Sequence, residues 1–383
     1  MTDAGPQAHR RPGPDIARGL ALAIVAISNT VWWLHGDQTG EPRRFAFAEA
    51  DMWVNSSNAL FITGRAYPMF SFLFGYGIVQ ALGNHIARGL SNRESNLLVV
   101  RRNWILIALG ALHALLLFNG DVLGAYGVLG FIVVLLARRS ERTILVAALL
   151  FLAFRIVYDH LNWSAGFAGN LLSYEVASAT SYLEAVPLRG QDWLGSFVSL
   201  PYYLAPMLFG VYAARLRILE EPGRHRKLLM WFVVGGFAVS ILGGLPEALA
   251  RADLWYTESE VAWRFFDTIR SASGILGGFA LAALCGQLAV AATTRNVFAT
   301  LAEPLRCLGQ RSLSGYLFQS FACLLIFPSY TLGLGSEVDA SGAAIIALIV
   351  WAVSIALAVI LDRSGSLGPG EWLMRRLVYG RKA

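Results

Sequence analysis

Residues 101–139 read RRNWILIALGALHALLLFNGDVLGAYGVLGFIVVLLARR. Two apolar runs, Trp104 to Phe118 and Val122 to Ala137, flank a short polar corner at residues 119–121. Each run is just long enough to cross a bilayer, because a helix rises about 1.5 Å per residue and the hydrocarbon core is about 30 Å thick. Arginine pairs at both ends of the stretch place those ends in the cytoplasm and the corner outside. The stretch therefore predicts a membrane hairpin.

The whole chain has the composition of a membrane protein. Its 383 residues are 56% hydrophobic and 15% charged, with a mean hydropathy of +0.54, which is too apolar for a soluble protein. The net charge of +6 comes mainly from basic residues beside alternate ends of apolar runs, so we expect a lipid bilayer and no nucleic acid as partner. Cys285, Cys307 and Cys323 lack the paired spacing of a disulfide or zinc site, and we expect no metal.

Ten apolar stretches alternate with loops that are basic on one side and acidic on the other. They predict an all-α polytopic membrane helix bundle of about ten transmembrane helices, with both termini cytoplasmic. The predicted spans are residues 16–34, 59–82, 104–118, 122–137, 143–158, 194–214, 228–245, 269–292, 312–334 and 343–361. The predicted domains are a disordered cytoplasmic tail (1–14), a single transmembrane helical domain (15–363) and a basic cytoplasmic C-terminal tail (364–383).

His113 is the candidate for chemistry, because it alone of six histidines lies within an apolar span. Histidine is the usual general base for transfer to a hydroxyl, since its ordinary pKa lies near neutral pH. Asp121 is the nearest carboxylate in the sequence and a candidate to orient the imidazole. Eight residues of helix extend about 12 Å, so the spacing argues against direct contact unless the corner folds back. The alternative is a histidine that merely bonds a neighbouring helix.

Three other charged residues have two interpretations each. An arginine in a membrane span costs about 2.5–3.5 kcal/mol on insertion scales, so Arg65 needs an anionic partner or water. Asp121, on the same outer side, is the predicted partner, in an ion pair or beside a substrate. Asp15 and Arg18 stand at helical i, i+3 spacing. They either set the inner end of the first span or contact a nucleotide-bearing donor.

Five motifs follow one another along nearly the whole chain. They are DIARG at 15–19 with Asn29, GR at 64–65 with MFSFLFGYG at 69–77, His113 with GDVL at 120–123 and Tyr126, LGQRSLSGYLFQS at 308–320, and GPGEWLMR at 368–375. In their order and spacing they resemble the YeiB-like family of bacterial multi-pass membrane proteins, a domain of unknown function.

This resemblance implies a function as well as a fold. The family is grouped with transmembrane acyltransferases, which move an acyl group from cytoplasmic acyl-CoA to an acceptor, often on the far side of the membrane. It implies a location in the bacterial cytoplasmic (inner) membrane, acyl-CoA (acetyl-CoA) as donor substrate, and a small-molecule, sugar or glycolipid acceptor. Many membrane O-acyltransferases carry a histidine eleven residues after the arginine of the first span. Counted from Arg18, this chain has Asn29 there, with His35 close behind.

The candidate residues therefore form three sets. The catalytic candidates are His113 and Asp121; those for substrate contact or a structural ion pair are Arg65, Asn29, His35 and Tyr126; those for binding the acyl donor are Asp15, Arg18 and Arg311. A second function fits the same residues, namely a transporter or exporter of a small polar or amphipathic solute, with Arg65, His113 and Asp121 lining a polar path. The sequence leaves open whether copies of the chain form a homo-oligomer.

Overall fold

Apolar runs of this length fold as helices, because inside a bilayer each backbone N–H and C=O must be hydrogen-bonded within the protein. The structure, a computed structural model, describes residues 12–35, 49–161 and 173–380. Within these ranges all regular structure is helical and no strand occurs. The predicted all-α class is confirmed. Residues 1–11 of the predicted N-terminal tail lie outside the described residues.

The described helices have the following order along the chain. In the first half they are α1 (Gly13–Asn29), η1 (Thr30–Trp32), α2 (Glu49–Phe61), α3 (Ala66–Ala87), α4 (Asn92–Leu116), α5 (Leu123–Ala137) and α6 (Glu141–Leu161). In the second half they are α8 (Tyr182–Gly195), η3 (Ser196–Ser199), α9 (Leu200–Arg215), α10 (Arg226–Trp231), the π-helical η4 (Phe232–Gly236), α11 (Phe237–Arg251), α12 (Glu260–Ala292), α13 (Asn296–Gln310), α14 (Ser312–Ile326), α15 (Ala340–Arg363) and α16 (Pro369–Tyr379).

Seven helical stretches of the described chain are long and apolar enough to cross a membrane. They are Gly13–Trp32, Asn92–Leu116, Glu141–Leu161, Tyr182–Arg215, Arg226–Arg251, Glu260–Ala292 and Ala340–Arg363. The shorter apolar helices α5 and α14, together with α3, coincide with the remaining predicted spans. Whether these three also cross, to give about ten crossings, stays a prediction, as does the cytoplasmic side of the termini.

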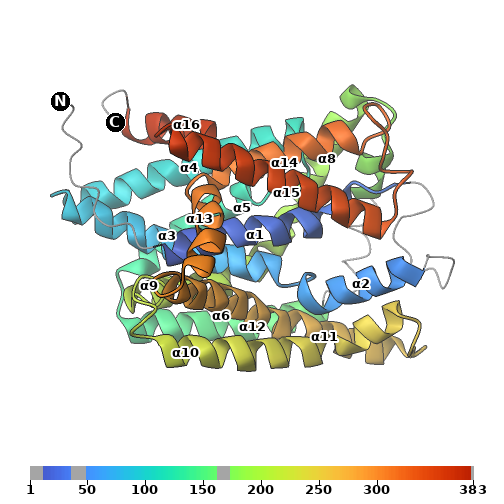
Figure 1. The fold of residues 1–383 in the computed structure, drawn as a ribbon, viewed down its shortest axis with the longest axis horizontal. Helices are drawn as coiled ribbons and strands as arrows, with labels where there is room; N and C mark the ends of the chain where they lie inside the picture. The colour runs from blue at the N-terminus through green and yellow to red at the C-terminus, as the bar shows by residue number, and fades with distance from the viewer. Residues whose placement is uncertain (1–11, 36–48, 162–172, 381–383) are drawn as a thin grey trace.

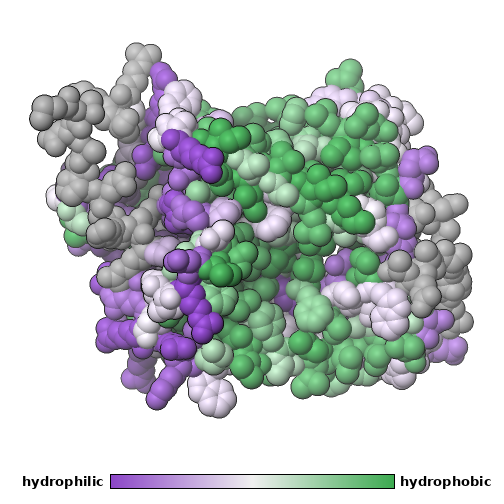
Figure 2. Space-filling view, in the orientation of Figure 1, coloured by the Kyte–Doolittle hydropathy of each residue, from purple (hydrophilic) through white to green (hydrophobic). Residues whose placement is uncertain are grey.

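The helices run mostly side by side along the long axis of the molecule, and α13 lies across them between α12 and α14 (Figure 1). The first residues of α1 and the last of α16 lie at the same end of this axis (Figure 1). Apolar residues form a broad central zone, and hydrophilic residues gather at the two ends (Figure 2). This distribution is that of a bundle with its long axis across a bilayer.

Glycine contacts between backbones hold the bundle together. A Cβ at Gly75 of α3 would lie 2.0 Å from the Met207 carbonyl oxygen of α9, and one at Gly210 of α9 would lie 2.0 Å from that of Phe72. Apolar lipid tails compete well with apolar side chains, so helices in membranes gain most by close backbone approach at small residues. The α3–α9 pair therefore depends on the missing side chains of Gly75 and Gly210.

The C-terminal tail contains a docked helix. In α16, the Glu371 carboxylate accepts hydrogen bonds from the backbone N–H of Leu313, at 2.8 Å, and of Ser314, at 3.3 Å. Tyr379, at the other end of α16, contacts the Nε2 atom of His85 through its hydroxyl at 2.9 Å. The helix thus joins the first turn of α14 to the last turns of α3.

We expect topology reporters to read outside at Gly120, outside near Asp192 and inside at the C-terminus. The reason is the alternation of basic and acidic loops across the bundle axis. Paired periplasmic and cytoplasmic reporter fusions measure this directly. An inside reading at Gly120 would overturn the orientation of the α4–α5 hairpin.

We also expect Gly75→Ala and Gly210→Ala each to lower the free energy of unfolding by about 1–3 kcal/mol, the usual cost of overpacking. Gly83→Ala, also in α3, is the matched control, because a Cβ there meets nothing within 4 Å. Denaturation of the purified variants in detergent is the measurement. Equal stability of Gly75→Ala and Gly83→Ala would show that the α3–α9 contact is looser than described.

Candidate functional site

His113 and Asp121 are in direct contact. Their Nδ1 and Oδ1 atoms lie 2.9 Å apart, and the exposed fractions of the two side chains are 1% and 0%. The inference from spacing that they would not meet is wrong. The corner folds back because α4 ends at Leu116, and the backbone N–H groups of Leu117 and Phe118 both bond to the His113 carbonyl oxygen. The chain then reverses within four residues and brings Asp121 beside the last turn of α4.

The Asp121 carboxylate is fully engaged. Its Oδ1 atom faces His113, while Oδ2 accepts hydrogen bonds from the backbone N–H of Gly124, at 2.9 Å, and from the indole Nε1–H of Trp193, at 3.3 Å. Both contacts of Oδ2 are with N–H donors, so the carboxylate acts there as a hydrogen-bond acceptor. We therefore assign the hydrogen of the His113 imidazole to Nδ1, which faces Oδ1.

This assignment leaves Nε2 of His113 as the acceptor, and Nε2 is buried without a hydrogen-bond partner among the described residues. The ring of Tyr316, in α14, packs with its centroid 4.9 Å from that of His113. Its hydroxyl is also buried and makes no hydrogen bond of ordinary geometry within the described chain. An imidazole held at Nδ1 by a carboxylate and without a hydrogen bond at Nε2 has the arrangement of a general base.

Glycines make the contact between α4 and α5 possible. A Cβ at Gly110 would lie 2.3 Å from the Gly124 nitrogen and 2.6 Å from Oδ2 of Asp121. A Cβ at Gly124 would lie 2.5 Å from the Trp193 ring. Any side chain at these two positions would displace either the carboxylate or the indole, so the pair depends on both glycines.

Arg65 does not pair with Asp121, and that prediction is wrong. Its buried guanidinium donates to the Ser240 hydroxyl at 2.9 Å, to the carbonyl oxygens of Ser240 and Ala59 at 2.7 Å, and to that of Thr63. Sequence spacing did not reveal α11 as the partner, because carbonyl oxygens carry no sequence signal. Arg65 pins the junction of α2 and α3 to α11, which is a structural role.

The residues predicted to bind an acyl donor lie at the arginine-rich end of the bundle. Asp15 and Arg18 form the predicted i, i+3 pair, with 2.8 Å between Oδ1 and Nη1. Arg311 instead binds Asp362 at 3.0 Å and the Ser366 carbonyl oxygen at 2.7 Å. The side chain of Arg311 thus contacts the end of α15, while Gly309, two residues before it, packs against the backbone of Asp15.

The other candidates have structural contacts. Tyr126 shares a hydrogen bond of 2.9 Å with the buried Ser71 hydroxyl. His35 is buried against Gly335, whose carbonyl oxygen accepts the His35 backbone N–H at 3.1 Å. Asn29 is the last residue of α1 and is half-buried.

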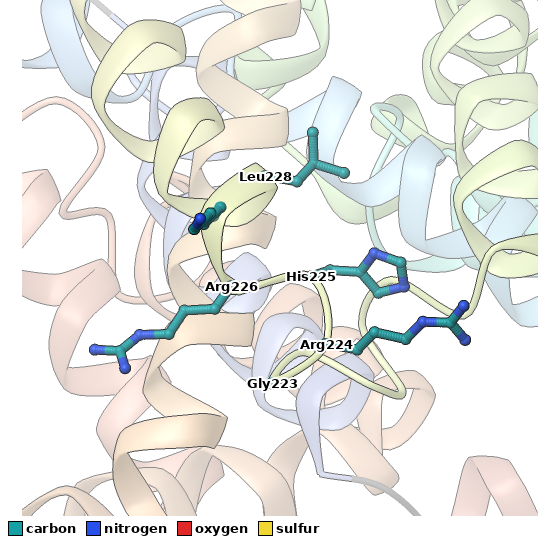
Figure 3. Close-up of a pocket in the computed structure, with 6 residues that line it drawn as sticks. Gly223, Arg224, His225, Arg226 and Leu228 are labelled. Atoms are coloured by element: carbon teal, nitrogen blue, oxygen red, sulfur yellow. The ribbon is translucent and has the colours of Figure 1, made fainter.

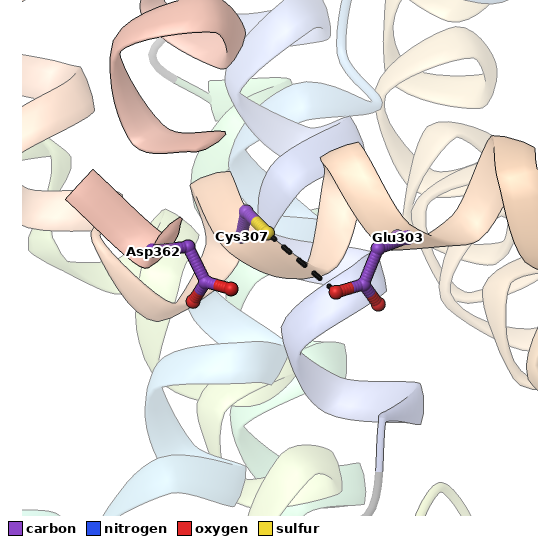
Figure 4. A group of neighbouring side chains, drawn as sticks. All are labelled: Glu303, Cys307 and Asp362. Atoms are coloured by element: carbon purple, nitrogen blue, oxygen red, sulfur yellow. Dashed lines mark hydrogen bonds between the residues drawn. The ribbon is translucent and has the colours of Figure 1, made fainter. Parts of the chain in front are cut away.

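One group of side chains resembles a metal site. The ligand atoms of Glu303, Cys307 and Asp362 lie within 4.8 Å of one another (Figure 4). Arg306 already bridges the two carboxylates, at 2.6 Å from Glu303 and 3.2 Å from Asp362. Burial raises the pKa of the Cys307 thiol to about 11, and its sulfur lies 3.8 Å from a Glu303 oxygen. The cluster is best described as an ion-pair network that ties α13 to α15.

An open hollow of about 460 Å³ lies at the start of α10, lined by residues 223–228. Arg226 points to one side of it, while Arg224 and His225 point to the other (Figure 3). Side chains that diverge in this way do not bind a common ligand, so we assign the hollow to the basic, solvated loop between α9 and α10.

Sequence reasoning missed α8, which lies in a stretch predicted to be an outer loop. Three of its residues, Arg189, Asp192 and Trp193, contact the α4–α5 corner. Their i, i+3, i+4 spacing puts them on one helix face, and this spacing was the available signal.

The fold and the buried His113–Asp121 pair define a polytopic all-α membrane protein with a titratable site inside the helix bundle. Residues 213–381 match the family described as "Protein of unknown function (DUF418)". The chain is 26% identical to "Uncharacterized protein YxaH" of Bacillus subtilis (strain 168), over 95% of this chain and 93% of that protein. It is also 26% identical to "Uncharacterized protein YeiB" of Escherichia coli (strain K12), over 95% and 94% of the two chains. The predicted resemblance to the YeiB-like family is confirmed.

We expect His113→Gln and Asp121→Asn to be coupled in a double-mutant cycle of unfolding free energy, by about 0.5–3 kcal/mol, because the two side chains share a buried hydrogen bond. Arg65→Gln combined with Asp121→Asn is the control cycle. It should be additive within about 0.5 kcal/mol, since the two residues have separate partners. Additivity in the first cycle would contradict the pairing.

Proposed function

We propose that this protein is a membrane-embedded acyltransferase. It would move an acyl group, most simply acetyl, from cytoplasmic acyl-CoA to a hydroxyl or amine of a sugar, glycolipid or secreted small molecule. The observation that carries the proposal is the His113–Asp121 pair, in which a buried carboxylate holds Nδ1 and leaves Nε2 free to accept a proton. The grouping of the YeiB-like family with transmembrane acyltransferases supports the choice of reaction.

The proposed step uses Nε2 of His113 as the base. It takes the proton of the acceptor hydroxyl while the acceptor oxygen attacks the thioester carbonyl carbon. A carbon–oxygen bond forms, the carbon–sulfur bond breaks, and the proton passes from Nε2 to the departing sulfur. Asp121 stabilises the positive charge that the imidazole carries between the two proton transfers.

The separation of His113 from the proposed donor end supports a reaction that runs across the membrane. His113 lies about 27 Å along α4 from Ser95, which bonds His85 near the arginine-rich end. A donor that enters at the Asp15–Arg18 end must therefore extend its acyl group into the outer half of the bundle. The acceptor would approach from the side of the α4–α5 corner.

A transporter would use the same buried charges without covalent chemistry, and donor binding separates the two functions. We expect the purified protein in detergent to bind acetyl-CoA. Binding of the solute alone, with no affinity for any acyl-CoA, would favour the transporter.

We expect His113→Gln to retain acetyl-CoA binding and to lose acyl transfer by about 10²–10⁴-fold, the usual contribution of a general base. Glutamine keeps a donor and an acceptor but does not act as a base near neutral pH. The measurement is transfer of radiolabelled acetyl from acetyl-CoA to extracted envelope glycolipid by proteoliposomes.

His85→Gln is the matched control for this experiment. His85 is also buried, but both of its ring nitrogens have partners, Ser95 and Tyr379. This variant should transfer at the wild-type rate. A folded His113→Gln protein with normal turnover would end the proposed role of His113.

A further inference from the structure

Helix α8 covers the α4–α5 corner through side chains of a single face. Arg189 donates to the carbonyl oxygens of Leu115 and Leu116, at 3.3 and 3.4 Å, where α4 ends. One turn later, Asp192 accepts a hydrogen bond of 2.6 Å from the Asn119 side chain. The three residues of this face, Arg189, Asp192 and Trp193, are all buried. This face of α8 therefore packs against the α4–α5 corner through buried, hydrogen-bonded side chains.

Trp193 differs from Arg189 and Asp192, because it contacts the catalytic candidate Asp121 directly. Its indole occupies the space that Gly124 leaves, and its Nε1–H donates to Oδ2 of Asp121 at 3.3 Å. This is the oxygen that does not face His113. Together with the Gly124 backbone N–H, which donates to the same oxygen at 2.9 Å, the indole holds the carboxylate from the opposite side and directs Oδ1 toward the imidazole.

We propose that Trp193 is a positioning residue for the His113–Asp121 pair, carried by α8 onto the corner of the hairpin. The expected effect of Trp193 on the reaction rate rests on the proposed function. Its effect on the geometry of the pair does not, because that is a property of the folded protein. In the proposed reaction Trp193 touches no reacting atom. It acts through Asp121, so its loss should disturb the orientation of the imidazole and leave donor binding intact.

Trp193→Phe tests the proposal, because phenylalanine keeps an apolar ring beside Gly124 and removes the N–H donor. We expect the Nδ1–H of His113 to exchange with solvent deuterium about tenfold faster, in keeping with the loss of a hydrogen bond to a charged group. Histidine-labelled NMR in detergent measures this, with the signal assigned by its absence in His113→Gln. The rate of acyl transfer should fall by a similar factor at an unchanged KM for acetyl-CoA.

Trp351→Phe is the matched control. The indole of Trp351 donates to the Gly19 carbonyl oxygen at 3.1 Å, so this variant also loses one indole hydrogen bond within the bundle, between α15 and α1. It should change neither the His113 exchange rate nor the rate of transfer. Wild-type exchange of His113 in Trp193→Phe would overturn the proposal.

Two further outcomes remain decisive. If the wild-type protein transfers no acyl group, the proposed function fails, but the exchange rate of the His113 Nδ1–H still tests Trp193. If Trp193→Phe does not fold, Asp121→Ala tests the contact from the other side, because alanine removes both acceptor oxygens. One tryptophan indole N–H should then exchange faster than in the wild type, and unchanged exchange of every indole would refute the contact.

Discussion

A charged side chain inside a bilayer must find its partners within the protein, because the hydrocarbon core supplies none. The fully buried arginines of this structure show how strongly that requirement organises the bundle. Arg65 binds backbone oxygens and a serine where the junction of α2 and α3 meets α11, and Arg155 of α6 binds the Ser271 hydroxyl of α12 at 2.5 Å. Arg189 of α8 binds the last carbonyl groups of α4. Each arginine joins helices that are distant in sequence, so satisfying its charge also determines which helices are neighbours.

Close backbone approach is the second requirement, and it explains why the candidate site forms where it does. Gly110 and Gly124 let α4 and α5 come so close that a Cβ at Gly110 would lie 2.6 Å from the Asp121 carboxylate. The carboxylate then meets His113 on one side and the Trp193 indole on the other. The site is therefore a product of helix packing, and its three polar groups come from α4, the corner and α8.

The proposed acyl transfer agrees with the separation between the Asp15–Arg18 end of the bundle and the His113 site. A basic end with the Asp15–Arg18 pair faces one side of the bundle, and the imidazole lies toward the other. A transferase with this layout would take its donor from the cytoplasm and modify an acceptor near the outer surface. A bundle that spans the bilayer keeps the donor side and the acceptor side apart.

The all-α class, the positions of the long apolar helices, the Asp15–Arg18 pair and the hairpin around residues 119–121 could all be predicted from the sequence. They depend on apolar length, arginine placement and helical spacing, which are local properties of the chain. Only the tertiary structure decided the contact of His113 with Asp121, the bonds of Arg65 to Ser240 of α11 and the place of Trp193. The physical reason is that these contacts depend on how closely helices approach at glycines and on backbone oxygens, and neither the tightness of a corner nor the location of a carbonyl group can be read from residue type.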